Sequence, residues 1–138
     1  MITVAMSEYR FEFPGRVPSG RVVFRMRNVG RRAHSATLLA LPDDLPPIDQ
    51  QLKGTERRYL EPFADVPPRR PGMSRSFAVD LQPGQRYALI CYTIDPDEQS
   101  HAAKGMSIEF RTPGSRGGQG VGDPVGAATV APDAVEPR

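Results

Sequence analysis

The sequence predicts an all-β protein, a two-sheet Greek-key sandwich with one short helix and a disordered C-terminal tail. Apolar and polar residues alternate in at least six short segments, as in strands that bury one face. Turn residues separate these segments, and the 138 residues include 15 prolines and 13 glycines, which favour short strands over long helices. After residue 113 the chain lacks aromatic residues and any hydrophobic period, which is typical of disorder. We therefore expect one sandwich domain over residues 1–112 and a disordered tail over 113–138.

Three strands are expected before residue 42 and three more between residues 74 and 112. The segments are 2–14, 21–27, 33–41, 74–84, 85–94 and 105–112. In the first segment the alternation changes phase between Met6 and Tyr9, which indicates a bulge or a bend. In the fifth segment apolar residues occupy both faces, so this strand is expected to be buried on both sides.

Between these two groups, residues 42–72 are expected to form a long loop around one short helix. Pro47 near the first turn and Gly54 just past the end suit a helix in "PPIDQQLKG". The stretch that follows, "TERRYLEPFADVPPRRPG", is expected to be irregular because prolines interrupt it. Four apolar residues are expected to attach this stretch to the domain: Tyr59, Leu60, Phe63 and Val66.

The composition argues against several classes of protein. The net charge is +2, and the basic residues are dispersed without interleaved aromatic residues, so no nucleic-acid partner is expected. A single cysteine excludes an internal disulfide framework. No apolar run reaches the roughly 18 residues that cross a bilayer, so no transmembrane segment is expected. No signal peptide is recognisable, which leaves the compartment open. We expect a monomer.

Four residues form a candidate copper site, and they include the single cysteine and both histidines of the chain: His34, Cys91, His101 and Met106. A type 1 copper site needs two neutral imidazoles and a thiolate, with a weak axial thioether. In "HAAKGM" the histidine and the methionine are close enough to converge from one tight loop. Two histidines cannot build a trinuclear copper cluster or a three-histidine zinc site, and one cysteine cannot build a two-thiolate copper centre. We therefore expect one copper ion and no enzymatic activity.

Each of these residues also has an ordinary structural explanation. Cys91 lies on an apolar strand, and free cysteine is often a small buried hydrophobic residue. Met106 shares a strand face with Ile108 and Phe110, as a core residue would. His101 on its own is a solvated loop residue, and His34 is a histidine at a strand end. Only the combination favours a metal site.

The chain resembles the cupredoxins, the plastocyanin and azurin family of small blue copper proteins. The resemblance rests on "VVFRMRNVGRRAHS", "GQRYALICY" and "HAAKGMSIEF", and covers roughly residues 2–112. It implies a type 1 site in which His34, Cys91 and His101 are equatorial ligands and Met106 is axial. It also implies a one-electron carrier that works with a larger redox protein, in the cell envelope or outside the cytoplasm. Ser35 matches a position that supports the site by a hydrogen bond across to the ligand loop.

The loop between Cys91 and His101 departs from the small electron carriers of the family. Nine residues, "YTIDPDEQS", separate the two proposed ligands, and the small carriers have fewer. We expect this insert to bulge away from the metal while its ends stay close. Two alternatives remain open: a Cu(I)-handling protein for storage, delivery or tolerance, and a metal-free interaction module on the same fold.

Overall fold

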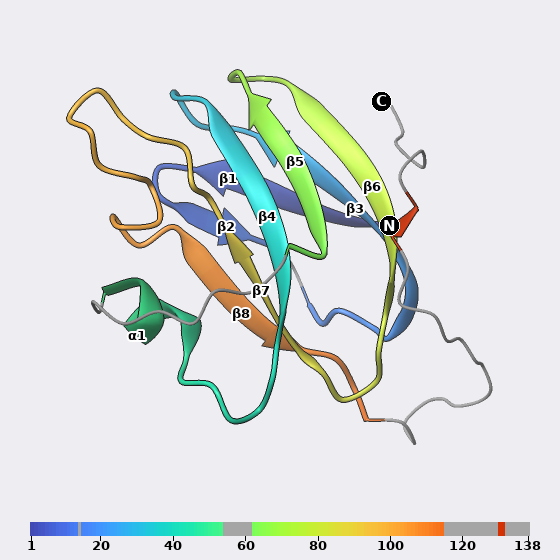
Figure 1. The fold of residues 1–138 in the computed structure, drawn as a ribbon. Coiled ribbons are helices and arrows are strands. Elements are labelled where there is room, and N and C mark those ends of the chain that lie inside the picture. Colours follow the sequence, from blue (N-terminus) through green and yellow to red (C-terminus); the bar gives the residue numbers. More distant parts are fainter. Residues whose placement is uncertain (14, 54–61, 115–129, 132–138) are drawn as a thin grey trace.

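The computed structural model describes residues 1–13, 15–53, 62–114 and 130–131. These residues form two stacked β-sheets and one short helix (Figure 1). The five-stranded sheet has the order β2-β1-β3-β6-β9, and the four-stranded sheet has the order β5-β4-β7-β8. The elements are β1 (Ile2–Ser7), β2 (Arg10–Glu12), β3 (Gly20–Asn28), β4 (His34–Leu41), α1 (Ile48–Lys53), β5 (Ala64–Arg69), β6 (Ser74–Leu81), β7 (Arg86–Ile90), β8 (Ser107–Arg111) and β9 (Val130–Ala131). The predicted all-β sandwich is confirmed.

The main core lies between the two sheets and follows the alternation of the sequence. In β3 the inward residues Val22, Phe24 and Met26 are at most 4% exposed. Their partner strand β6 contributes Phe77 and Val79 from opposite positions of the antiparallel ladder. Burying these side chains drives the stacking of the sheets, since each contributes roughly 1.5–3 kcal/mol when removed from water.

A second cluster lies on the outer face of the four-stranded sheet. Helix α1 places Ile48 and Leu52 against this face, and Ala88 and Ile90 of β7 belong to the same cluster. The opposite face of β7 carries Leu89 into the main core. The prediction that this strand is buried on both sides is therefore confirmed, and the helix is the element that covers its outer side.

Several expectations about local structure are corrected or sharpened. The change of phase after Met6 is the turn of a hairpin, because β1 and β2 pair as antiparallel strands. The expected short helix is α1, but the stretch expected to be irregular contains β5, which pairs with β4. The prolines are tolerated because β5 is an edge strand, where backbone groups on one side need no strand partner. Val66 is buried and Phe63 is half-buried, as expected.

Some predictions lie outside the described residues. This is true of Tyr59 and Leu60 and of most of the predicted disordered tail. In that tail the structure describes residues 113–114 and β9, whose backbone pairs with β6. Disorder of the remaining tail stays a prediction. Among the described residues, no helix is long and apolar enough to cross a membrane.

Candidate metal centre

The two histidines and the cysteine meet at one end of the sandwich. His34 is the first residue of β4, and Cys91 follows β7 directly. Strands β4 and β7 are antiparallel neighbours, so the start of the first strand and the end of the second lie side by side. His101 comes from the loop after Cys91. The three candidate ligand atoms lie within 4.8 Å of one another, and all three side chains are fully buried.

The ring nitrogens of the two histidines have different surroundings. The Nδ1 atoms of His34 and His101 face each other at 3.1 Å. The Sγ atom of Cys91 lies 3.4 Å from the same Nδ1 of His101. Both Nδ1 atoms and the sulfur therefore point into one small space, whereas both Nε2 atoms point away from it. Two nitrogens and one sulfur converging in this way match the equatorial donor set of a type 1 copper site.

Cys91 is placed where a thiolate is favoured. Burial alone raises the pKa of its thiol, but hydrogen bonds with His34, Ser35 and Thr93 outweigh burial and lower the pKa to about 6. The backbone N–H of Ser35 points at the sulfur from 3.4 Å. The Ser35 hydroxyl also bonds the Thr93 hydroxyl at 2.9 Å, and so reaches across to the ligand loop. Since the thiolate is the form of cysteine that binds metals, these contacts prepare Cys91 to be a ligand.

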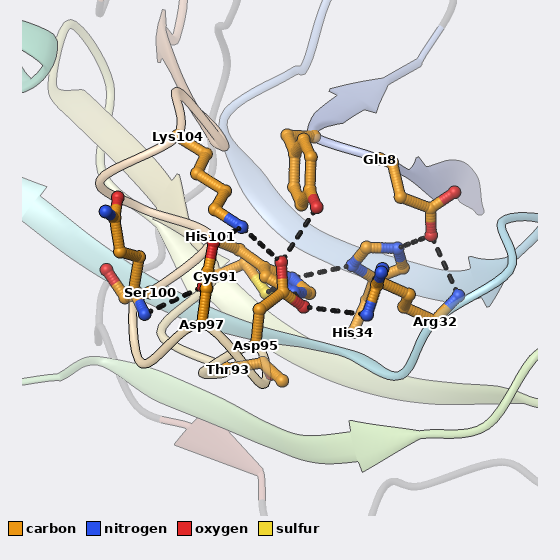
Figure 2. Close-up of polar contacts among 12 residues, drawn as sticks. Glu8, Arg32, His34, Cys91, Thr93, Asp95, Asp97, Ser100, His101 and Lys104 are labelled. Atoms are coloured by element: carbon orange, nitrogen blue, oxygen red, sulfur yellow. Dashed lines mark hydrogen bonds and ion pairs between the residues drawn. The ribbon is translucent and has the colours of Figure 1, made fainter.

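Each histidine donates its outer N–H to a carboxylate (Figure 2). His34 Nε2–H donates to Glu8 at 2.8 Å, and His101 Nε2–H donates to Asp95 at 2.7 Å. These bonds select the tautomer in which Nδ1 carries a free lone pair, and they hold each ring in orientation. For His34, burial lowers the pKa, but hydrogen bonds with Cys91 and Glu8 outweigh burial and raise it.

Asp95 joins the centre to a polar cluster at its edge. Hydrogen bonds from Lys104, at 2.7 Å, and from His101 and Tyr9 hold the pKa of the Asp95 carboxyl well below its usual range. The same contact, together with Asp97, raises the pKa of Lys104. The Tyr9 ring also packs edge-on against the His101 ring, with centroids 5.0 Å apart. The outer edge of His101 is therefore covered by protein.

The nine-residue insert folds as a closed excursion. A β-bridge joins Ile94 to Ser100, and the N–H of His101 donates to the carbonyl of Thr93 at 2.7 Å. These contacts place His101 next to Thr93, so His101 lies close to Cys91 in space although nine residues separate them in the sequence. The tip, residues 96–99, is exposed, as expected of an insert that bulges away. Asp95 does not follow the tip outward: its side chain turns back onto His101, and the residue is buried.

Met106 lies in the main core beside Cys91 and is fully buried. The N–H of Cys91 donates to the Met106 carbonyl at 3.2 Å, and the N–H of Met106 donates to the His101 carbonyl at 3.0 Å. The backbone of the tight loop thus ties Met106 to both residues. Its role as the axial ligand stays a prediction.

Comparison with known proteins supports the fold. No protein-family model matches the chain, and no curated protein sequence matches it. Among solved structures, dithionite-reduced auracyanin from the photosynthetic bacterium Roseiflexus castenholzii aligns with a TM-score of 0.55 and 17% identity, over 80% of this chain and 94% of that chain. Auracyanin B aligns with a TM-score of 0.54 and 15% identity, over 80% of this chain and 86% of that chain. The chain has a cupredoxin fold. The resemblance inferred from the sequence is thereby confirmed at the level of fold.

The two carboxylates that hold the histidines of this candidate centre could not be found in the sequence. Glu8 lies at the turn between two strands, where a charged residue is ordinary. Asp95 lies in "DPDEQS", a polar stretch that reads as a solvated loop. The change of phase after Met6 was the only local signal near Glu8, and it indicated a bend and no function.

Proposed function

We propose that this protein binds one copper ion in a type 1 site and carries single electrons between larger redox proteins. His34, Cys91 and His101 would be the equatorial ligands, Met106 the axial ligand, and Ser35 a supporting residue. The observation that carries the proposal is the convergence of two Nδ1 atoms and one thiol sulfur in a fully buried space. Bound copper would supply one-electron chemistry by alternating between Cu(I) and Cu(II).

The residues around the donors fit this role. A carrier works best when its donors keep nearly the same positions in both oxidation states, so that little reorganisation is needed. The outer N–H groups of the two histidines are held by Glu8 and Asp95, and the sulfur of Cys91 is held by Ser35. Burial of all three donors excludes water as a competing ligand. The frame is therefore set before the metal binds.

The same features favour a carrier over a protein that passes copper on. Delivery requires a donor that can leave the metal easily, and a long loop could provide it. Here the loop is closed by the Ile94–Ser100 bridge and by the hydrogen bond from His101 to Thr93. Opening it would also break the contacts of Asp95 with Tyr9 and Lys104.

The direct test is a titration of the purified protein with Cu(II), followed by visible absorption and metal analysis. We expect one copper per chain and an intense thiolate-to-copper band at about 600 nm. Cys91→Ser should lose the band, whereas Ile94→Ala, an exposed residue of the same loop, should keep it. A band that survives Cys91→Ser, or no band at all, would refute the proposal.

Two further measurements separate the alternatives. Copper that exchanges readily with a chelator, without reversible oxidation and reduction, would favour a copper-handling protein. Thermal stability that copper leaves unchanged would favour a metal-free module, because a ligand that binds only the folded state must stabilise it. For the electron carrier we expect slow exchange, reversible redox cycling and a raised melting temperature.

A further inference from the structure

Two neighbouring loops at the ligand end present exposed apolar and basic side chains. The loop between β3 and β4 carries Val29, which is 55% exposed, and the exposed Arg31 and Arg32. The turn between β5 and β6 carries Met73, which is 46% exposed, and the exposed Arg70. We call these five residues the Arg31 face.

Asn28 joins the two loops into one surface. Its side-chain amide donates to the carbonyl of Arg32 and to the carbonyl of Arg69, each at 2.8 Å. Its backbone N–H donates to the carbonyl of Met73, and its carbonyl accepts the N–H of Gly72. Asn28 is fully buried, so these bonds are protected from water. The two loops of the Arg31 face are therefore fixed relative to each other. This preorganisation lowers the entropy lost when a partner binds.

This face adjoins the metal centre through Glu8. Glu8, Arg31 and Arg32 line an open depression of about 570 Å³. The Glu8 carboxylate accepts the backbone N–H of Arg32 at 2.8 Å and the Nε2–H of His34 (Figure 2). It also accepts the backbone N–H of Arg31 at 2.9 Å. The Glu8 side chain is 24% exposed. A single residue thus separates a proposed copper ligand from solvent on this side.

The hydrogen-bonded route from the other imidazole, His101, to solvent is longer. Beyond His101 lies Asp95, whose side chain is only 5% exposed. The next residues outward are Lys104, whose side chain is 22% exposed, and Arg32 of the Arg31 face, whose side chain is 49% exposed. The hydrogen-bonded route from His101 through Asp95 therefore needs one residue more than the route from His34 through Glu8 to reach similar exposure. The shorter route ends at the Arg31 face.

The charge on this face is positive. Among the described residues, neither Arg31 nor Arg70 has a carboxylate partner, and Arg32 reaches only the buried Asp95, at 3.5 Å. The charge of Glu8 is already engaged by His34 and by two backbone N–H groups. The exposed acidic residues of the ligand loop, Asp97 and Glu98, lie on the excursion beyond Asp95.

We propose that the Arg31 face is the docking site for an acidic redox protein, and that Glu8 connects this site to His34. Apolar Val29 and Met73 would make the close contact, while the arginines would steer a negatively charged partner to it. Transient redox complexes use interfaces of less than about 1,200 Å², in which opposite charges raise the rate of association. Electron transfer through His34 and Glu8 rests on the proposed function. The position and charge of the Arg31 face do not depend on it.

The first experiment maps anion binding on the full chain by nuclear magnetic resonance. The probe is the paramagnetic anion hexacyanochromate(III), which broadens signals close to it. We expect the amide signals of residues 29–32 and of Arg70, Gly72 and Met73 to broaden first, and Arg31→Glu to suppress this effect. Arg16→Glu is the matched control, because Arg16 is also exposed but lies in the connection between β2 and β3. Broadening centred elsewhere, or equally reduced by both variants, would overturn the proposal.

The second experiment measures electron transfer from the copper-loaded, reduced protein to ferricyanide, which takes one electron and becomes ferrocyanide. At low ionic strength, Arg31→Glu and Arg70→Glu should each slow the reaction at least about threefold, and salt should remove the difference. Arg16→Glu should have a smaller effect. With the cationic oxidant tris(phenanthroline)cobalt(III), Arg31→Glu should speed the reaction.

These results distinguish the two proposals. A protein without the copper band but with selective broadening at residues 29–32 would refute the proposed function and leave the anion-binding face supported. A protein with the band, in which Arg31→Glu and Arg16→Glu behave alike with both oxidants, would refute the docking site alone.

Discussion

Replacing Gly30 by alanine is expected to disturb the metal centre although Gly30 contacts none of the proposed ligands. A Cβ atom at this position would lie 2.6 and 2.9 Å from the two carboxylate oxygens of Glu8, and 3.0 Å from the Cα of Ser7. The carboxylate can swing away more easily than the backbone of Ser7 can move. The alanine methyl should therefore displace Glu8 from the site where it holds His34.

The size of the effect follows from the contacts of Glu8. Its carboxylate accepts the Nε2–H of His34 and the N–H groups of Arg31 and Arg32. A hydrogen bond to a charged group contributes roughly 1.5–3 kcal/mol, and water replaces part of this at a partly exposed site. We expect the variant to lose about 1–3 kcal/mol of unfolding free energy. Copper affinity should fall by about 10- to 100-fold, as is usual when a group that orients a metal ligand is lost.

The assay combines urea unfolding of the metal-free protein with competition for copper against a chelator. Gly114→Ala is the matched control, since a Cβ there would meet no atom within 4 Å. The control should change neither quantity. If Gly30→Ala retains both the stability and the copper affinity of the wild type, the inferred role of Glu8 is wrong.

Three further predictions concern the remaining parts of the centre and the core. Asp95→Asn removes the negative charge next to His101, so it should raise the reduction potential and weaken Cu(II) binding by about tenfold, measured by spectroelectrochemistry and chelator competition. In the metal-free protein the ultraviolet absorbance of the Cys91 thiolate should titrate with a midpoint at about pH 6. The pKa of Cys91 in the folded state lies below its unfolded value of 9.0. The unfolding free energy of the wild type, compared with that of Cys91→Ser, should therefore increase as the pH rises from about 6 to 9, and this advantage should be absent below pH 6. Leu38→Ala should cost about 2–5 kcal/mol in urea unfolding, because Leu38 is fully buried in the main core.

Each of these predictions has a control and a result that contradicts it. For Asp95, the exposed neighbour Asp97 can be changed to asparagine, and an equal shift of potential in both variants would mean that contact with His101 is unimportant. For Cys91, a midpoint near the ordinary thiol value would show that the hydrogen bonds do not stabilise the thiolate. For Leu38, the exposed Ile94→Ala should cost less than about 0.5 kcal/mol, and similar losses would contradict the placement of the core.

The strands and the order of the candidate ligands could be predicted from the sequence because both depend on local pattern. Alternation in β3 identified Val22, Phe24 and Met26 as inward residues, and the structure buries all three. The single cysteine and the two histidines left few possible combinations for a metal site. The strand β5 was missed because its prolines oppose a strand in general, and only its position at a sheet edge makes them acceptable.

Contacts between distant segments were decided by the tertiary structure alone. Glu8 and His34 come from different sheets, and Asp95 reaches His101 only because a bridge closes the insert. Nothing in the residues near Glu8 or Asp95 distinguishes them from solvated carboxylates on a turn and a loop. The sequence by itself determined which residues are candidate metal ligands, since that depends on side-chain chemistry. Which carboxylates orient them, and which side of the centre opens to solvent, depends on how the sheets and loops stack, and so on the fold as a whole.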